Sequence, residues 1–281
     1  MERQKQKALI ADEGVPEIKS PMTVSDYERL GDIYFEQGNI DIAFVQYNKA
    51  LHLDPGQNNI RYKIGCLFLK KGLAEEARQE FEEILKNNSN NSLNALTYLG
   101  LGRAYFKIGD YEKAKDSFLQ ATNLDASLWE AHNFIGIIYD QQRQFDAAIT
   151  QYFEAIAIKP NISILFNNLG ISFLLKGEYD KSAKSFSEAL QFEPQDSKVY
   201  NNLALALFKL ERYTEAFEAF RKGGSDTTAY NNLGYMYMTE GKNDKATEYF
   251  KRAIEMNPRF YVRAYENMKA VEEAAHIPSQ Q

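Results

Sequence analysis

The sequence predicts an all-α fold, an α-solenoid of about seven helical hairpins that ends in a capping helix. A small residue recurs roughly every 34 residues, at Gly31, Gly65, Gly102, Gly136, Gly170, Ala204 and Gly234. In every unit a second small residue follows it by 12 positions and an aromatic ring by 16, as Ala43 and Tyr47 follow Gly31. A unit of this length cannot bury its own hydrophobic face, so neighbouring units must stack into a one-dimensional array.

Each unit is predicted to contain two helices whose contact is set by small residues. The glycine of the first helix and the alanine or serine of the second let the helices approach closely, and the aromatic ring fills the space before the next hairpin. Proline cannot continue a helix, so Pro55, Pro160, Pro194 and Pro258 mark the ends of second helices. The predicted units are 24–57, 58–94, 95–128, 129–162, 163–196, 197–226 and 227–260.

Two units depart from the regular length. Three extra residues fall between the second and third units, and we expect the polar run at 86–94 to hold them as a loop. The sixth unit is four residues short and ends with Gly223 and Gly224, and two adjacent glycines are expected to stop its second helix early. The angle between the sixth and seventh units is therefore expected to differ from the others.

The two ends of the chain lie outside the repeats. Residues 1–23 are polar and are expected to form a flexible segment, without the apolar stretch of a signal peptide. After Pro258 the spacing of apolar residues predicts a capping helix over 261–275 and a tail over 276–281. The apolar residues of that helix are Tyr261, Ala264, Tyr265, Met268 and Val271.

The segments 30–55 (LGDIYFEQGNIDIAFVQYNKALHLDP) and 233–258 (LGYMYMTEGKNDKATEYFKRAIEMNP) resemble the tetratricopeptide repeat. The resemblance covers residues 24–260. It implies a right-handed superhelix of helix pairs whose first helices line a concave groove that holds partner proteins. Repeats of this family that bind the acidic tails of cytosolic chaperones carry lysine where this chain has Glu28 and Tyr62, so a chaperone-tail adaptor is not expected.

Asparagines gather at one position of the predicted groove. They are Asn133, Asn167, Asn168, Asn201, Asn202, Asn231 and Asn232, and an apolar strip one turn on comprises Ile137, Ile171, Leu205 and Tyr235. Asparagine is unfavourable inside helices, so a stack of asparagines indicates a specific role. The amides could pair with the main chain of an extended or partly helical partner segment. This row resembles the asparagine ladder of the O-linked N-acetylglucosamine transferases. Alternatively, or in addition, the amides bond between neighbouring repeats and set their register.

Composition and charge exclude several classes of function. The net charge of −6 disfavours non-specific binding to nucleic acid or anionic lipid, and no apolar window is long enough for membrane insertion. Charged residues of both signs mark the groove side of the first three units. The chain as it stands is expected to be cytoplasmic, or periplasm-facing if a leader was removed.

Catalysis is not expected. The three histidines, His52, His132 and His276, lie far apart without metal-ligand spacing, and no phosphate loop or serine elbow appears. We therefore predict no enzyme activity, cofactor or metal.

The expected function is that of a non-enzymatic scaffold or adaptor for a protein or peptide partner. Two alternatives are a self-assembling structural scaffold, with homo-oligomers, and a targeting subunit of a separately encoded enzyme. Residues 229–268 also resemble repeat proteins of bacterial tight-adherence pilus assembly, although this chain lacks the lipid-bearing cysteine that such proteins commonly carry near the start. That resemblance implies a secretion, pilus or envelope setting.

Overall fold

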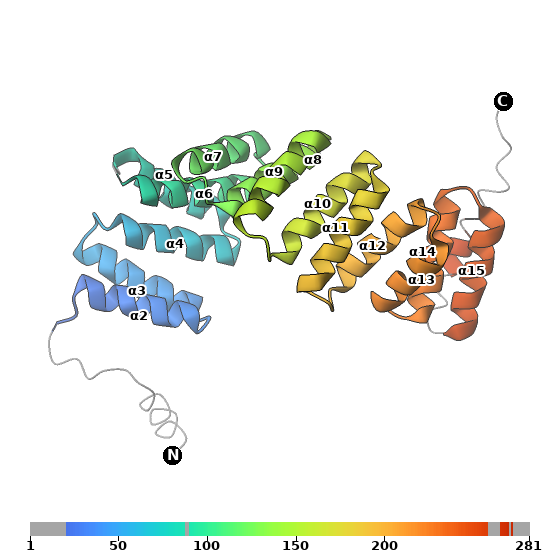
Figure 1. Ribbon diagram of the computed structural model, residues 1–281. Coiled ribbons are helices and arrows are strands. Elements are labelled where there is room, and N and C mark those ends of the chain that lie inside the picture. The colour runs from blue at the N-terminus through green and yellow to red at the C-terminus, as the bar shows by residue number, and fades with distance from the viewer. Residues whose placement is uncertain (1–20, 88–89, 258–264, 270, 272–281) are drawn as a thin grey trace, which may run out of the picture. The chain divides into compact units, whose positions relative to one another are not determined.

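The computed structural model describes residues 21–87, 90–257, 265–269 and 271, and all regular secondary structure in them is helical (Figure 1). The chain divides into two compact bodies, which meet in sequence between Leu124 and Asp125. The N-terminal body contains α2 (Val24–Glu36), α3 (Ile40–Leu53), α4 (Asn58–Lys71), α5 (Ala74–Asn87), α6 (Asn91–Ile108) and α7 (Tyr111–Leu124). The predicted all-α class is confirmed.

The C-terminal body holds the remaining four helical hairpins. Its helices are α8 (Trp129–Gln141), α9 (Phe145–Ile158), α10 (Ser163–Lys176), α11 (Tyr179–Phe192), α12 (Ser197–Lys209), α13 (Tyr213–Lys222), α14 (Asp226–Thr239) and α15 (Asn243–Met256). Each second helix of this body packs against the first helix of its own hairpin and, up to α13, against that of the next. We number the hairpins as repeats one to seven in chain order.

Close approach of helices explains the recurring glycines. A Cβ atom built on Gly170 would lie 2.7 Å from the ring of Phe186, and one built on Gly136 would lie 2.7 Å from that of Tyr152. The ring of Phe81 fills the space between two hairpins, because Cβ atoms on Gly65 and Gly100 would lie 2.6 and 2.5 Å from it. Even an alanine at these glycines therefore forces a shift, so the spacing of the repeats depends on them.

The ends of the second helices follow the prolines. Helices α3, α9 and α11 end two residues before Pro55, Pro160 and Pro194, as predicted. In the sixth repeat α13 has only ten residues and ends with Gly223 at its C-cap. The early stop predicted from the two glycines is therefore confirmed.

The polar run at 86–94 was expected to be a loop, and this prediction is partly wrong. Helix α5 continues to Asn87 and α6 already begins at Asn91, so α6 has 18 residues. The side chain of Asn90 caps α6 by accepting a hydrogen bond from the backbone N–H of Leu93 at 3.2 Å, and Leu93 is buried. A longer first helix thus takes up part of the inserted sequence.

Of the predicted capping helix, residues 265–269 and 271 are described and all are helical. Val271 is buried, and Met268 packs against the core of repeats five to seven. The rest of 261–275 lies outside the described residues, as do most of the N-terminal segment and the tail. No helix in the described ranges is both long enough and apolar enough to cross a bilayer.

Candidate peptide-binding face on repeats four to seven

The predicted asparagines lie on the first helices α8, α10, α12 and α14 of the C-terminal body. They divide into two groups by burial. Asn133, Asn167 and Asn231 are 8%, 9% and 4% exposed, so their side chains belong to the contacts between helices. The second group is half-buried and comprises Asn168, Asn201, Asn202 and Asn232. Only the half-buried amides remain candidates for contact with a partner.

Hydrogen bonds join the asparagines of successive repeats. Asn168 donates from Nδ2 to Oδ1 of Asn133 at 2.9 Å, and Asn202 donates in the same way to Asn167 at 2.9 Å. Each bond spans 35 residues, about one repeat. The inter-repeat role that sequence reasoning offered as an alternative is therefore present in the structure. We call this row of bonds the asparagine ladder.

The ladder extends beyond repeat seven. Asn267 donates from Nδ2 to Oδ1 of Asn231 at 3.3 Å, across 36 residues. Sequence reasoning missed Asn267, because it lies after the last proline and outside the repeat pattern. Along the sequence, Asn267 follows Asn231 by 36 residues, close to the 35 residues that separate the partners of the other ladder bonds. This separation is the signal that could have identified it.

The ladder is interrupted at one link. No hydrogen bond joins Asn232 to Asn201 among the described residues, and Oδ1 of Asn201 is buried without a partner there. The two asparagines are 31 residues apart, four fewer than at the intact links, because α13 is short. The carbonyl of Ser197 and the amide of Asn201 both face Gly223, where a Cβ would lie 2.9 and 2.8 Å from them. The short sixth repeat thus changes the register between α12 and α14.

The predicted apolar strip is only partly accessible. Ile137, Ile171 and Leu205 are half-buried and pack against the inter-repeat core, whereas Tyr235 is 48% exposed. Sequence reasoning missed Ile164 and Leu175 on α10, which are 48% and 55% exposed.

Ile164 and Leu175 share a helix face with Asn168. The residues at 164, 168, 171 and 175 are spaced i, i+4, i+7 and i+11, so they project from one side of α10. This spacing was readable from the sequence. We call Ile164, Leu175 and Tyr235 the apolar flank.

A half-buried carboxylate ties repeat four to repeat five. Asp140 on α8 accepts hydrogen bonds from the hydroxyl of Tyr152 at 2.8 Å and from Oγ of Ser172 at 2.7 Å. Burial raises the pKa of Asp140 above the usual aspartate range, while the two hydroxyl donors act in the opposite direction. Burial and the neighbouring carboxylate likewise hold the pKa of Tyr152 well above its usual range. The two bonds link α8 to α9 and α10, so this group serves the packing of the two repeats.

The charged residues on the first helices of repeats one and two pair with one another. Nζ of Lys63 lies 2.7 Å from Oε1 of Glu28 and 2.8 Å from both carboxylate oxygens of Asp32. Tyr47 donates its hydroxyl to Asp32 at 2.6 Å. The mixed charges noted in the sequence are therefore largely satisfied within the N-terminal body.

Metal-binding chemistry is not supported in the described part of the chain. No group of three or more His, Cys, Asp or Glu side chains within it could hold a metal ion. His132 contacts Oε1 of Gln151 at 2.9 Å, and burial raises the pKa of the Cys66 thiol.

Curated relatives match parts of the chain. It is 31% identical over 142 residues to anaphase-promoting complex subunit cut9 of Schizosaccharomyces pombe, covering 48% of this chain and 21% of that protein. It is 29% identical over 124 residues to the BBSome complex member BBS4 of Bos taurus, covering 44% and 23% respectively. The chain thus spans less than a third of the length of these relatives.

Solved structures share the fold. MamA is 28% identical with a TM-score of 0.51, covering 60% of this chain and 96% of that one. The C-terminal part of a tetratricopeptide repeat protein from Cytophaga hutchinsonii is 18% identical with a TM-score of 0.65, covering 85% and 98%. The predicted repeat solenoid is therefore confirmed.

Two family models match the sequence. The tetratricopeptide repeat matches residues 227–260, within the seventh repeat. The model of the cilia and flagella-associated protein 70 C-terminal domain matches residues 3–220, most of the chain. The chain therefore belongs to the tetratricopeptide repeat family of the cilia and flagella-associated protein 70 C-terminal domain.

Proposed function

We propose that the protein is a scaffold that binds an extended or partly helical segment of a partner protein along the first helices of repeats four to seven. Tetratricopeptide repeats in general support protein–protein interaction. The observation that carries the finer proposal is the face of α10, where Ile164 and Leu175 are about half exposed on either side of Asn168. Exposed aliphatic side chains can contact apolar side chains of a bound segment, and the amide between them can hydrogen-bond to its main chain.

The asparagine ladder leaves amide atoms available to that segment. An asparagine side chain has two N–H donors and one oxygen that can accept twice. The ladder uses one N–H each of Asn168 and Asn202. The second N–H of each amide can donate to a carbonyl of the partner. The same asparagines can therefore set the register of the repeats and bind a partner.

A role inside a multiprotein assembly fits the relatives, one of which is an anaphase-promoting complex subunit and another a BBSome complex member. This favours a scaffold without catalytic activity of its own. A targeting subunit of a separately encoded enzyme remains the second candidate. The bacterial secretion, pilus or envelope setting rests on the resemblance of residues 229–268 alone and stays a prediction, as does the compartment.

The experiment uses a peptide ligand selected on the full chain from a random phage-displayed library, with affinity measured by fluorescence anisotropy. We expect Ile164→Ser and Leu175→Ser each to weaken binding by roughly tenfold. The matched control is Phe153→Ser on the second helix α9, where the ring is 52% exposed. Equal losses in all three variants would contradict the proposal, and so would a selection in which no peptide loses affinity through the first two substitutions.

A further inference from the structure

We propose that the surface of the first hairpin is a second, separate binding site, which takes an apolar segment of another protein that carries carboxylates. We call it the α2–α3 site. It lies in the N-terminal body and is formed by Tyr27 of α2 with Phe44, Val45, Lys49 and Leu53 of α3. It shares no residue with the face proposed above, so the two proposals can fail independently.

The first hairpin departs from the pattern of the other repeats at two surface positions. Two residues after the buried small residue of its second helix stands Val45, which is 48% exposed. The same position holds polar or charged residues in all other repeats: Gln79, Asp116, Thr150, Lys184, Glu218 and Glu248. A solvated helix face is expected to be polar at such positions.

Ile42, one residue before the buried Ala43, is a similar exception and is 44% exposed. Its counterparts are Glu76, Lys113, Ala147, Lys181, Glu215 and Lys245. Ile42 and Val45, about one helical turn apart on α3, form an apolar patch where most of the other repeats carry polar or charged residues. Contiguous exposed apolar surface of this kind marks interaction sites.

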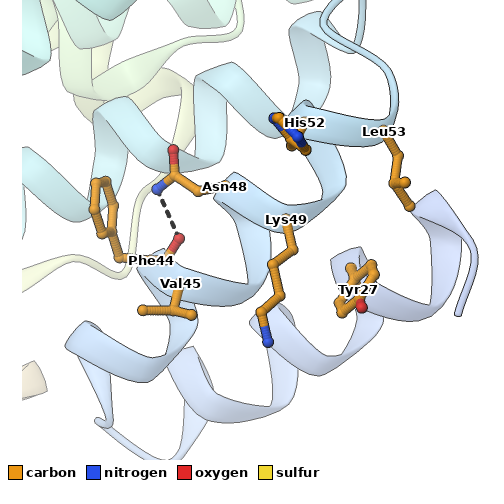
Figure 2. Close-up of a pocket in the computed structure, with 7 residues that line it drawn as sticks. All are labelled: Tyr27, Phe44, Val45, Asn48, Lys49, His52 and Leu53. Atoms are coloured by element: carbon orange, nitrogen blue, oxygen red, sulfur yellow. Dashed lines mark hydrogen bonds between the residues drawn. The ribbon is translucent and has the colours of Figure 1, made fainter.

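A hollow accompanies the patch. Its volume is ≈ 580 Å³, within the range of about 300–1,000 Å³ typical of ligand sites. Figure 2 shows the side chains of Tyr27, Val45, Lys49, His52 and Leu53, all of which line this hollow. Asn48 is fixed at the edge, because its Nδ2 donates to the carbonyl oxygen of Phe44 at 2.8 Å. The walls are therefore mainly aliphatic and aromatic.

The charge at the site sets the chemistry of its occupant. Lys49 and His52 line the hollow, and no carboxylate does. Nζ of Lys49 lies 5.5 Å from the centre of the Tyr27 ring, and no carboxylate of the described residues forms an ion pair with it. A cation held against an aromatic wall beside apolar side chains favours a ligand that pairs aliphatic groups with an acid. Asp or Glu next to Leu, Ile or Val in the partner meets both requirements.

The test uses two fluorescein-labelled peptides, LLEELLEELL and its uncharged counterpart LLQQLLQQLL, and measures anisotropy with the full chain. We expect the acidic peptide to bind at least tenfold more tightly than the glutamine peptide. Lys49→Glu should remove that preference. Val45→Gln, which copies the residue of repeat two, should weaken the acidic peptide at least tenfold. Glu248→Gln, at the same position in repeat seven, is the matched control and should have no effect.

Three outcomes would overturn the proposal. The first is equal binding of the acidic peptide to wild type and Val45→Gln. The second is a dimer of the wild type, seen by light scattering, that Val45→Gln dissociates, because the occupant would then be a second copy. The third is tighter peptide binding by Leu9→Glu, because the chain's own first 20 residues would then compete for the site. Circular dichroism melts check that Val45→Gln, a change at an exposed position, leaves the fold intact.

Discussion

The amide nitrogen of Asn202 lies 2.9 Å from the amide oxygen of Asn167, one repeat earlier in the chain. The acceptor is 9% exposed, so the bond forms largely out of water, where an unmade hydrogen bond is costly. Every repeat in such an array contacts its neighbours only, and a bond between equivalent positions fixes how one repeat sits on the next. The ladder therefore fixes the register of the repeats, and the proposed binding would use the amide atoms that these bonds leave free.

The coupling between these two amides can be measured with a double-mutant cycle. Asn167→Ala should lower the free energy of unfolding by about 1–2 kcal/mol, because it removes a buried acceptor and leaves Asn202 without its partner. The coupling between Asn167→Ala and Asn202→Ala should be about 0.5–1.5 kcal/mol in urea unfolding. Strict additivity of the two substitutions would show that the bond does not contribute to stability.

Asn201 should behave in the opposite way from Asn167. Its Oδ1 is buried without a partner among the described residues. Folding therefore removes the hydrogen bonds of this atom to water and forms none in their place, which is unfavourable. Asn201→Ala should leave the free energy of unfolding unchanged or raise it by up to about 1 kcal/mol, by urea titration. A loss as large as that of Asn167→Ala would mean that another group satisfies the oxygen in solution.

Gly223→Ala should destabilise the junction between repeats six and seven by about 1–3 kcal/mol, the usual range for overpacking. The added methyl group would lie 2.9 Å from the backbone oxygen of Ser197, which cannot easily move, and 2.8 Å from the side chain of Asn201. Combining it with Asn201→Ala should recover part of the loss.

Gly224→Ala is the matched control for that substitution. The atoms nearest to its methyl group would be Cβ, Cγ2 and Oγ1 of Thr228 at 3.1–3.2 Å, so a shift of a few tenths of an ångström would make room. Thermal melts of Gly223→Ala and Gly224→Ala that coincide would contradict this account of the junction.

Tyr152→Phe should destabilise the protein more at pH 7.5 than at pH 4. The pKa of Asp140 is raised in the folded state by burial, so the stability linked to its proton is present below the unfolded pKa of about 3.9 and lost as pH rises through the folded value. Removal of the Tyr152 donor raises that pKa further and penalises the ionised carboxylate more.

At pH 7.5 the loss should be about 1–3 kcal/mol, as for a hydrogen bond to a charged group. Tyr235→Phe, at an exposed ring, is the control and should show no difference between the two pH values in urea unfolding. A Tyr152→Phe effect that is independent of pH would indicate that packing alone accounts for it.

Sequence reasoning identified the fold because its signals are local and repeated. Gly170 and Phe186 mark one helix contact, and the same pair of residue types recurs in most units, so each unit supports the next. The asparagine row was also readable, but its use was not. Whether Asn168 faces a partner or Asn133 depends on the relative rotation of two helices, and no spacing along the chain specifies that angle.

Most of the residues that sequence reasoning missed are apolar residues whose role depends on their exposure. Leu175 and Ile171 are both aliphatic residues of α10, yet the first is 55% exposed and the second packs against the core. Val45 is distinguished by its 48% exposure at a position where the other repeats carry polar or charged residues. Asn267 lies after the repeats, where the period no longer directs attention to it.

The absence of a ladder bond between Asn201 and Asn232 in the described residues has a consequence for the ligand sequence that the protein could recognise. A ligand main chain whose polar groups are spaced to bond Asn168 and then Asn202 would not place its next group opposite Asn232. The reason is that α14, which carries Asn232, follows a shortened repeat. A segment that contacts all three amides would need a bend or an extra residue at that point. Under the proposed function, the recognised sequence would be gapped, with two short blocks joined by a spacer of defined length.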